Sequence, residues 1–177
     1  MILAIFTLTI CLILFCLLTT FLYYLVITGM FSVPFVPTSA KDLNPVLKRA
    51  KLKRGIQFVD LGCGDGRLVI EAVRTYTVKG VGIDINPLLI WFAKIRVYFL
   101  KLENAIFLRK DLYSYSLENA DVVYLFLFPR MMDKMSAKIK KECKKGTLII
   151  SRGFELPGFK KIDEIPTKTF ETFFYKV

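Results

Sequence analysis

The chain has 177 residues, and 26 Lys and Arg against 15 Asp and Glu give it a formal net charge of +11, which favours anionic partners without choosing among them. It contains no histidine, which excludes Ser-His-Asp and Cys-His catalysis and metal sites built on histidine. The four cysteines lack the paired spacing of a zinc site or a disulfide framework, so no metal is expected.

The N-terminus is uncharged as far as Lys41. Residues 2–30 are almost wholly apolar, and about 20 such residues are enough to cross a bilayer. Tyr23 and Tyr24, near the end of this run, suit the membrane–water interface. We therefore predict a transmembrane anchor over residues 1–30. A signal peptide is disfavoured, because no Lys or Arg precedes the run and no small-residue cleavage site follows it. A buried helix of a soluble protein is the remaining alternative.

The segment after the anchor is basic. One acidic residue, Asp42, stands there among six basic ones: Lys41, Lys48, Arg49, Lys51, Lys53 and Arg54. By the positive-inside rule, this distribution predicts that the C-terminal domain lies on the cytoplasmic side of a single span. The same basic cluster also suits anionic headgroups.

Residues 31–41 are predicted to form a linker. Pro34 and Pro37 prevent a continuous helix there and favour an extended chain. Ser39 or Asp42 is then expected to cap a short amphipathic helix at the start of the folded domain.

Strand and helix patterns alternate through that domain, residues 42–177. Strands are expected over 56–61, 80–85, 105–108, 121–128, 147–151, 160–164 and 169–177, and helices over 66–75, 87–102 and 130–144. Gly146 is expected to end the last helix. Pro166 lies between the last two strands, which predicts an antiparallel hairpin. The pattern predicts an α/β fold with a mostly parallel sheet.

A glycine-rich turn follows the first strand, with the sequence Gly62-Cys63-Gly64-Asp65-Gly66. Glycines let a backbone approach a ligand closely, and the N-terminus of the next helix offers free N–H groups. Asp60 precedes the turn. Asp84 ends the second strand 22 residues after Gly62, a spacing suited to a ribose. The sequence therefore predicts a nucleoside cofactor at this turn.

The turn resembles the first motif of the Rossmann-like methyltransferases, and Gly82–Pro87 (GIDINP) resembles their second. A longer set of segments resembles the membrane-anchored lysine methyltransferases of the ATP synthase c-subunit and the adenine nucleotide translocase, with their prokaryotic relatives. The shared segments are PFVPT, DLGCGDGR, INPLLIWFAKIR, RKDLYSYSL, VVYLFLFPRMM and IISRGFELPGF. This chain has Asp84 where the mitochondrial enzymes commonly have glutamate, and Cys63 where they commonly have serine.

The resemblance implies a Rossmann-like methyltransferase sandwich that uses S-adenosyl-L-methionine. It implies a set of cofactor-binding residues: Asp60, Gly62, Gly64, Gly66, Asp84 and Asp111. A dinucleotide enzyme is disfavoured, because the GxGxxG spacing is absent and Asp65 would face a pyrophosphate; the cationic cofactor, by contrast, suits nearby acids. The alternatives are a hydrogen bond within the turn for Asp60 and a capping role for Asp111.

The acceptor pocket is expected at the end of the fourth strand, where the sequence reads Leu127-Phe128-Pro129-Arg130. The Asp/Asn-Pro-Pro-aromatic run typical of base amino-methyltransferases is absent, which argues against nucleic acid as a partner. A dry aromatic pocket lowers the pKa of a lysine and orients it. Its predicted members are Phe128, Pro129, Tyr113 and Phe154, with Phe126 and Phe35 as further candidates. Trp91 is expected to pack within its helix layer, with a platform for the substrate as the alternative.

The resulting hypothesis is a membrane-anchored protein-lysine N-methyltransferase whose substrate is a membrane protein. A methyltransferase of a small or lipid-like molecule is the first alternative. The second is a non-catalytic S-adenosylmethionine-binding module with a basic face for nucleic acid or lipid.

Overall fold

The computed structural model describes residues 2–31, 40–166 and 170–177 and divides the chain into two units, Met1–Val36 and Pro37–Val177. The first unit contains helix α1 (Ile2–Phe31). Its segment Ala4–Tyr24 is long and apolar enough to span a membrane, a property that signal sequences and core helices share, and none of it is buried. Threonine hydroxyls along α1 donate to backbone carbonyls of the same helix, as from Thr9 to Ile5 over 2.8 Å.

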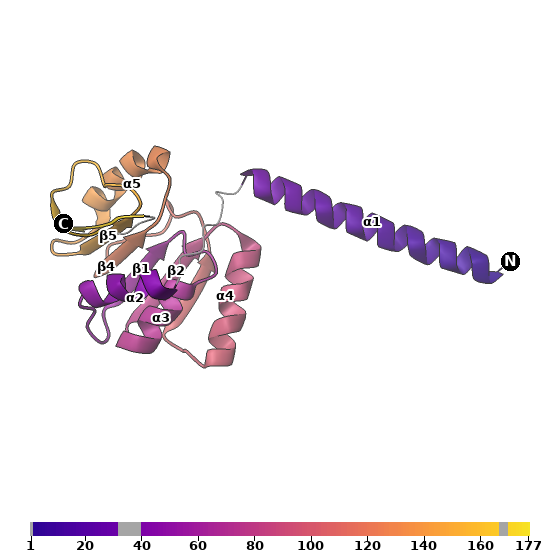
Figure 1. The fold of residues 1–177 in the computed structure, drawn as a ribbon, viewed down its shortest axis with the longest axis horizontal. Coiled ribbons are helices and arrows are strands. Elements are labelled where there is room, and N and C mark those ends of the chain that lie inside the picture. Colours follow the sequence, from indigo (N-terminus) through magenta and orange to yellow (C-terminus); the bar gives the residue numbers. More distant parts are fainter. Residues whose placement is uncertain (1, 32–39, 167–169) are drawn as a thin grey trace. The chain divides into compact units, whose positions relative to one another are not determined.

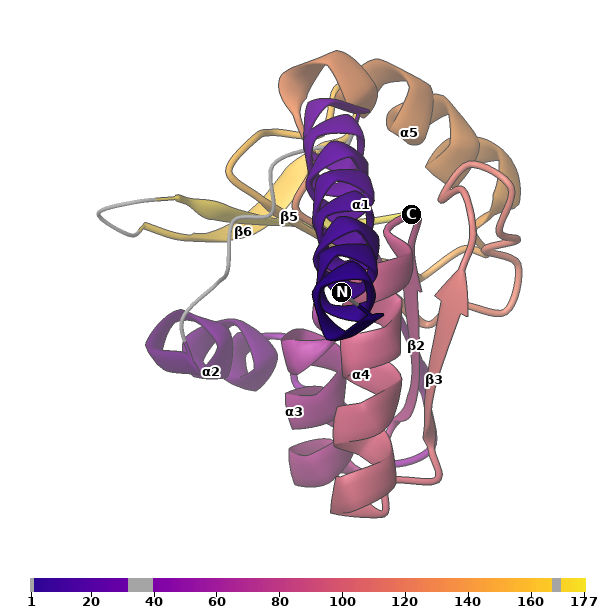
Figure 2. The same cartoon turned by 90° about the vertical axis from the view of Figure 1, so that its right-hand side faces the viewer.

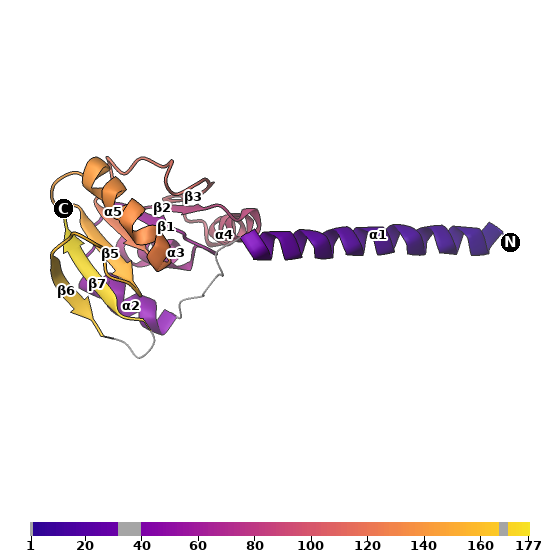
Figure 3. The ribbon, with the colours of Figure 1, turned by 90° about the horizontal axis from the view of Figure 1, so that it is seen from above.

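The second unit is built on a sheet of seven strands in the order β3-β2-β1-β4-β5-β7-β6 (Figure 1). The strands are β1 (Gln57–Leu61), β2 (Lys79–Asp84), β3 (Ala105–Arg109), β4 (Val122–Leu125), β5 (Leu148–Arg152), β6 (Lys161–Ile165) and β7 (Thr172–Lys176). The five strands β1 to β5 pair in parallel, and β7 pairs antiparallel with both β5 and β6. The sheet is that of a Rossmann-like methyltransferase, as predicted, and Figure 3 shows the predicted hairpin at the edge away from β3.

Helices cover both faces of the sheet, and the core is accordingly in two layers. The helices are α2 (Ala40–Arg49), α3 (Arg67–Tyr76), α4 (Pro87–Leu100) and α5 (Pro129–Glu142). Side chains from α2, α3 and α4 form one cluster with Phe58 of β1, and those of α5 form the other with Val59 and Leu61. This alternation along β1 is the period of two expected of a strand buried on both faces. Figure 2 shows α3 and α4 in front of β2 and β3.

Local signals explain where α4 begins. The Asn86 side chain accepts hydrogen bonds from the amides of Leu88 and Leu89, and Pro87 occupies the first turn of α4, a position where its missing N–H costs nothing. Asp42 lies in the first turn of α2 and does not cap it, because α2 begins at Ala40.

Two predictions for this unit need correction, and a third concerns residues that the structure does not describe. Helix α5 ends at Glu142 with Cys143 as its cap, and Gly146 lies beyond it with φ +93° in the turn before β5, so Gly146 is not the helix cap. Strand β4 ends at Leu125 and not at Phe128, because its pairing with β1 and β5 stops there and the chain turns into α5. Ser39 and most of the predicted linker lie outside the described residues.

Candidate active site at the carboxyl ends of β1, β2 and β4

The turn between β1 and α3 holds its shape through its backbone. The amides of Gly62 and Cys63 both donate to the Ile83 carbonyl of β2, over 2.8 and 2.9 Å. Gly66 precedes α3 with φ +75°, and a Cβ there would lie 2.5 Å from the Phe107 ring. A glycine is therefore required at Gly66 both by its left-handed backbone and by the ring packed against it. The turn brings the predicted glycines together at the edge where β1 and β2 end.

Asp84 is tied to the turn by two hydrogen bonds. Its Oδ2 accepts from the Gly64 amide over 2.9 Å, and its Oδ1 accepts from the Asn86 amide over 2.8 Å. The carboxylate is half-buried, and each of its oxygens has a second lone pair beyond these bonds. The structure thus places Asp84 beside the glycine turn, as the sequence predicted.

Asp60 is a buried carboxyl, with only 3% of its surface exposed. Burial raises its pKa well above the usual value, and the nearby charges of Asp84 and Asp65 raise the pKa further. Across the described residues, no group donates a hydrogen bond to this carboxyl, so a bond within the turn does not account for it. Its surroundings favour a neutral carboxyl or a cation brought close to it.

Asp65 is paired differently from what the sequence suggested. It forms ion pairs with Arg67 over 2.8 Å and with Arg96 over 3.1 Å. Burial raises its pKa, but the Arg67 hydrogen bond and the charges of both arginines outweigh burial and lower the pKa overall. Asp65 is therefore an ionised side chain whose charge is neutralised by two arginines.

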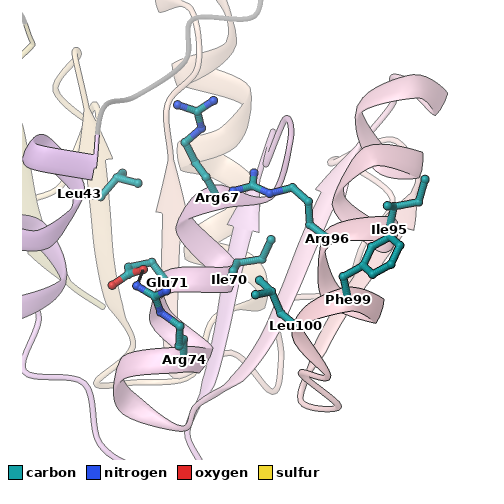
Figure 4. A pocket seen from close by; sticks show the side chains of 9 residues that line it. All are labelled: Leu43, Arg67, Ile70, Glu71, Arg74, Ile95, Arg96, Phe99 and Leu100. Carbon is teal, nitrogen blue, oxygen red and sulfur yellow. Dashed lines mark hydrogen bonds and ion pairs between the residues drawn. The ribbon is translucent and has the colours of Figure 1, made fainter.

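A groove lies beside these arginines, between α3 and α4, with a volume of about 650 Å³ (Figure 4). Its lining residues are Leu43, Arg67, Ile70, Glu71, Arg74, Ile95, Arg96, Phe99 and Leu100. In Figure 4, Arg96 extends from α4 toward Arg67 at the start of α3, while Ile70 and Leu100 face each other between the helices. The groove flanks the predicted cofactor turn and does not include the turn's glycines.

Asp111 follows β3 and is exposed. Its Oδ1 accepts from the Tyr113 amide over 2.9 Å, and its carbonyl accepts from the Ser114 amide over 3.0 Å. The residues after it form a turn and not a helix. Asp111 stabilises this turn, and in the described part of the structure its Oδ2 remains open to a ligand.

Three of the predicted acceptor-pocket residues lie near the end of β4 and the start of α5, and Phe154 follows β5. Phe128 is half-buried and precedes α5, and Pro129 is exposed at its first position. The Tyr113 hydroxyl donates to the Met131 carbonyl over 3.5 Å, and the Lys134 Nζ lies 4.0 Å from the Tyr113 ring centroid. These contacts bring Tyr113 against the first turns of α5, the helix that begins at Pro129 directly after Phe128.

Phe154 packs, like Tyr113, against the core layer of α5, whereas Phe126 packs against the opposite layer and contacts Phe170 edge-on, with ring centroids 5.0 Å apart. Phe126 and Phe154 therefore pack against different core layers. Phe35 lies outside the described residues. Trp91 was expected to pack within its helix layer, and that prediction is wrong, because 56% of it is exposed.

The sequence reasoning missed a buried arginine at the end of β5. Arg152 is 2% exposed, its Nη2 lies 3.2 Å from the Asp42 Oδ2, and its guanidinium lies 5.8 Å from the Phe126 ring centroid. Its Nε and Nη1 have no hydrogen-bond partner in the described chain. A single Arg after a β-rich run carries no sequence signal for this contact, because Asp42 lies 110 residues away.

Comparisons with known proteins agree with this geometry. Residues 60–163 match the model of the ANTKMT methyltransferase domain. A protein-lysine N-methyltransferase of Saccharolobus islandicus is 33% identical over 134 residues, which are 72% of this chain and 80% of that protein. The lysine N-methyltransferase of the ATP synthase c-subunit from Mus musculus is 32% identical over 125 residues, 70% of this chain and 50% of that protein. This chain thus spans most of the archaeal relative and about half of the mouse one.

A solved structure is similar over most of its length as well. It is an RNA methyltransferase from Salinibacter ruber in complex with S-adenosyl-L-homocysteine, with a TM-score of 0.77 and 27% identity. The match covers 80% of this chain and 94% of that one. The glycine turn, Asp60 and Asp84 all lie within the matched family domain.

Proposed function

The chain belongs to the ANTKMT methyltransferase family, and from that premise we propose that it is a protein-lysine N-methyltransferase that uses S-adenosylmethionine and acts on a membrane protein. The observation that carries the proposal is the match to the Saccharolobus islandicus lysine methyltransferase across 72% of this chain and 80% of that protein. The name of the mouse relative, which specifies a component of ATP synthase, supports a membrane-protein substrate.

The residues at the turn fit this cofactor. Its sulfonium makes the attached methyl group electrophilic, and its ammonium adds a second positive charge. Asp60 is buried with a raised pKa and no donor among the described residues, so a cation beside it would relieve the cost of its ionisation. We propose that Asp60 faces the cationic part of the cofactor.

The remaining cofactor contacts follow from open positions at the same edge. Gly62, Gly64 and Gly66 let the backbone come close to the ligand, and the N-terminus of α3 suits its carboxylate. We propose that Asp84 binds the ribose hydroxyls with the lone pairs left beyond its two amide bonds. The open Oδ2 of Asp111 suits the amino group of adenine.

For the chemical step, the protein needs mainly to position the two reactants and to exclude water from the site. A lysine ε-amine must first lose its proton to solvent. Its nitrogen lone pair then forms a bond to the methyl carbon as the S–CH3 bond breaks, so that the sulfonium becomes a neutral thioether and the amine a methylammonium. We propose that Tyr113, Phe128, Pro129 and Phe154 surround the lysine side chain and favour its neutral form through desolvation.

The location that we propose also starts from the family to which the chain belongs. We propose that α1 spans the membrane once and that the catalytic domain lies on the cytoplasmic side, where the basic residues after the span favour it. Tethering to the bilayer raises the concentration of membrane substrates around the domain. Protease digestion of sealed cells and of inverted vesicles tests the orientation: the domain should be cut in inverted vesicles alone.

The acceptor is tested by incubating the full-length protein and radiolabelled S-adenosylmethionine with membranes from cells that lack the gene. Label should appear in a protein band, and amino-acid analysis of that band should yield methylated lysine. The Asp84→Ala variant, with weakened cofactor binding, serves as a control and should transfer less label at limiting S-adenosylmethionine. Label recovered in lipid extract or in nucleosides would refute lysine as the acceptor, and S-adenosylmethionine binding with no transfer to any fraction would favour a non-catalytic module.

A further inference from the structure

Helix α4 has an apolar face on each side. Ile90 and Ala93 are buried against the sheet, at 3% and 0% exposure. A second set of apolar residues recurs at intervals of three and four positions and so lies on one outer face. We call this set the α4 outer face, and its members are Leu88, Trp91, Phe92, Ile95, Tyr98 and Phe99.

This outer face is open in the folded domain. Tyr98 is 79% exposed, Phe99 76%, Trp91 56% and Phe92 50%. Its rings contact one another rather than the core, with centroids 5.2 Å apart for Trp91 and Phe92 and 5.7 Å apart for Tyr98 and Phe99. Helices that are apolar all round are normally buried all round, and a continuous exposed apolar patch marks an interaction surface.

Basic side chains border the face on both sides. At helical spacing, Lys94 and Lys101 lie along one border and Arg96 along the other, and all three are exposed. Arg96 also pairs with Asp65 at the groove of Figure 4. Long basic side chains at the edge of an apolar stripe extend toward phosphates while their methylenes cover apolar surface. No acidic residue lies within α4.

We propose that the α4 outer face lies in the interfacial region of an anionic phospholipid bilayer, the same bilayer that α1 spans. Tryptophan and tyrosine are the residues that concentrate at this depth. Eight residues separate α1 from α2, and a chain of that length reaches at most about 30 Å even when fully extended, so an α1 anchored in the bilayer would keep the domain within about that distance of it. The basic borders and the net charge of +11 complement anionic headgroups.

Trp91 is the single tryptophan of the chain and reports directly on this contact. The full-length protein would be reconstituted in vesicles of phosphatidylcholine and phosphatidylglycerol, made with or without brominated acyl chains. Bromine near the interface should quench Trp91 emission by at least about twofold, and acrylamide in the water should quench it less than in a protein whose tryptophan is fully exposed. Trp91 that is open to acrylamide and insensitive to bromolipid would overturn the proposal.

Two variants sharpen the test. Tyr98→Ser with Phe99→Ser keeps the reporter and removes two of the three other aromatic side chains of the face, and it should weaken bromolipid quenching and open Trp91 to acrylamide. Ile162→Ser is the matched control, because Ile162 is 57% exposed on β6, outside the proposed face, and it should change neither. Trp91 shielded from acrylamide but untouched by bromolipid, with dimers trapped by cross-linking, would assign the face to a second copy and refute lipid contact.

The cofactor affinity of each variant shows that the domain remains folded. It also separates this inference from the proposed methyl transfer, since loss of lipid contact leaves binding of S-adenosylmethionine unchanged.

Discussion

The Asp84 carboxylate accepts a hydrogen bond from the Gly64 amide over 2.9 Å, and this bond joins the end of β2 to the turn that follows β1. The same carboxylate also accepts from the Asn86 amide at the start of α4. Asp84 therefore holds three elements of the site in register as well as offering its remaining lone pairs to a ligand. Replacing it should affect both the shape of the turn and the affinity of the cofactor.

Asp84→Ala is expected to weaken S-adenosylmethionine binding by about 1–3 kcal/mol, because two backbone donors and the ligand lose their acceptor. Asp84→Glu should be milder, since a carboxylate remains. Calorimetry measures the affinity, and thermal unfolding shows that the domain is intact. An alanine variant that folds and binds as the wild type does would show that Asp84 does not hold the ribose.

Asp60→Asn tests the buried carboxyl. The folded-state pKa of Asp60 is raised by burial and by neighbouring acids, so the stability that this group contributes is present below its unfolded pKa of about 3.9 and is lost as the pH rises through the folded value. The variant should flatten the fall in unfolding free energy above about pH 4 and make the cofactor-free domain more stable at neutral pH.

The same substitution should weaken S-adenosylmethionine binding by about 1–3 kcal/mol, because a charge-assisted contact is removed. Urea titrations from acid to neutral pH, with and without the cofactor, measure both effects. A variant as pH-dependent as the wild type would show that another group titrates.

Gly66→Ala should destabilise the domain more than Gly55→Ala. Both glycines have positive φ, +75° and +80°, and both substitutions incur about 1–2 kcal/mol of backbone strain. Only at Gly66 would the new Cβ meet the Phe107 ring, at 2.5 Å, which adds about 1–3 kcal/mol of overpacking. Chemical unfolding of the two variants gives the difference, and Phe107→Leu should restore part of it. Equal losses at the two positions would contradict the steric argument.

Asp42→Ala should destabilise the domain by about 1–3 kcal/mol, because the buried Arg152 guanidinium loses its carboxylate partner. Adding Arg152→Met should recover stability, since a buried charge without a partner costs more than an apolar side chain of similar length. Unfolding free energies of the single and double variants form the test. A double variant less stable than Asp42→Ala alone would mean that Arg152 stabilises the fold by other contacts.

Removal of residues 1–30 should leave the affinity for S-adenosylmethionine unchanged, because the second unit has its own two-layer core. Activity on a membrane substrate at low enzyme concentration should fall by about tenfold or more, as expected when tethering is lost. Activity on a soluble lysine peptide serves as the control and should not fall. Full activity of the truncated protein on membranes would show that tethering plays no role.

The sequence by itself determined which helices and strands form and how they follow one another along the chain, because strand and helix periods and the glycine turn are local signals. It also indicated which strand ends carry Asp60 and Asp84, since parallel strands bring their carboxyl ends to one edge. The hairpin of β6 and β7 followed from Pro166 and from the two strand-like segments that flank it. The end of β4 could not be predicted from the sequence, because the apolar run continues past Leu125, the last residue that has a strand partner.

Only the tertiary structure decided the partners of the charged groups and the faces of the aromatic ones. Asp65 pairs with Arg96 across 31 residues of chain, and Asp42 pairs with Arg152 across 110. Trp91 lies on an apolar helix that any sequence rule would bury, and it is exposed because the sheet covers only one side of α4. Periodicity tells which residues share a face, whereas what covers that face depends on elements distant in sequence.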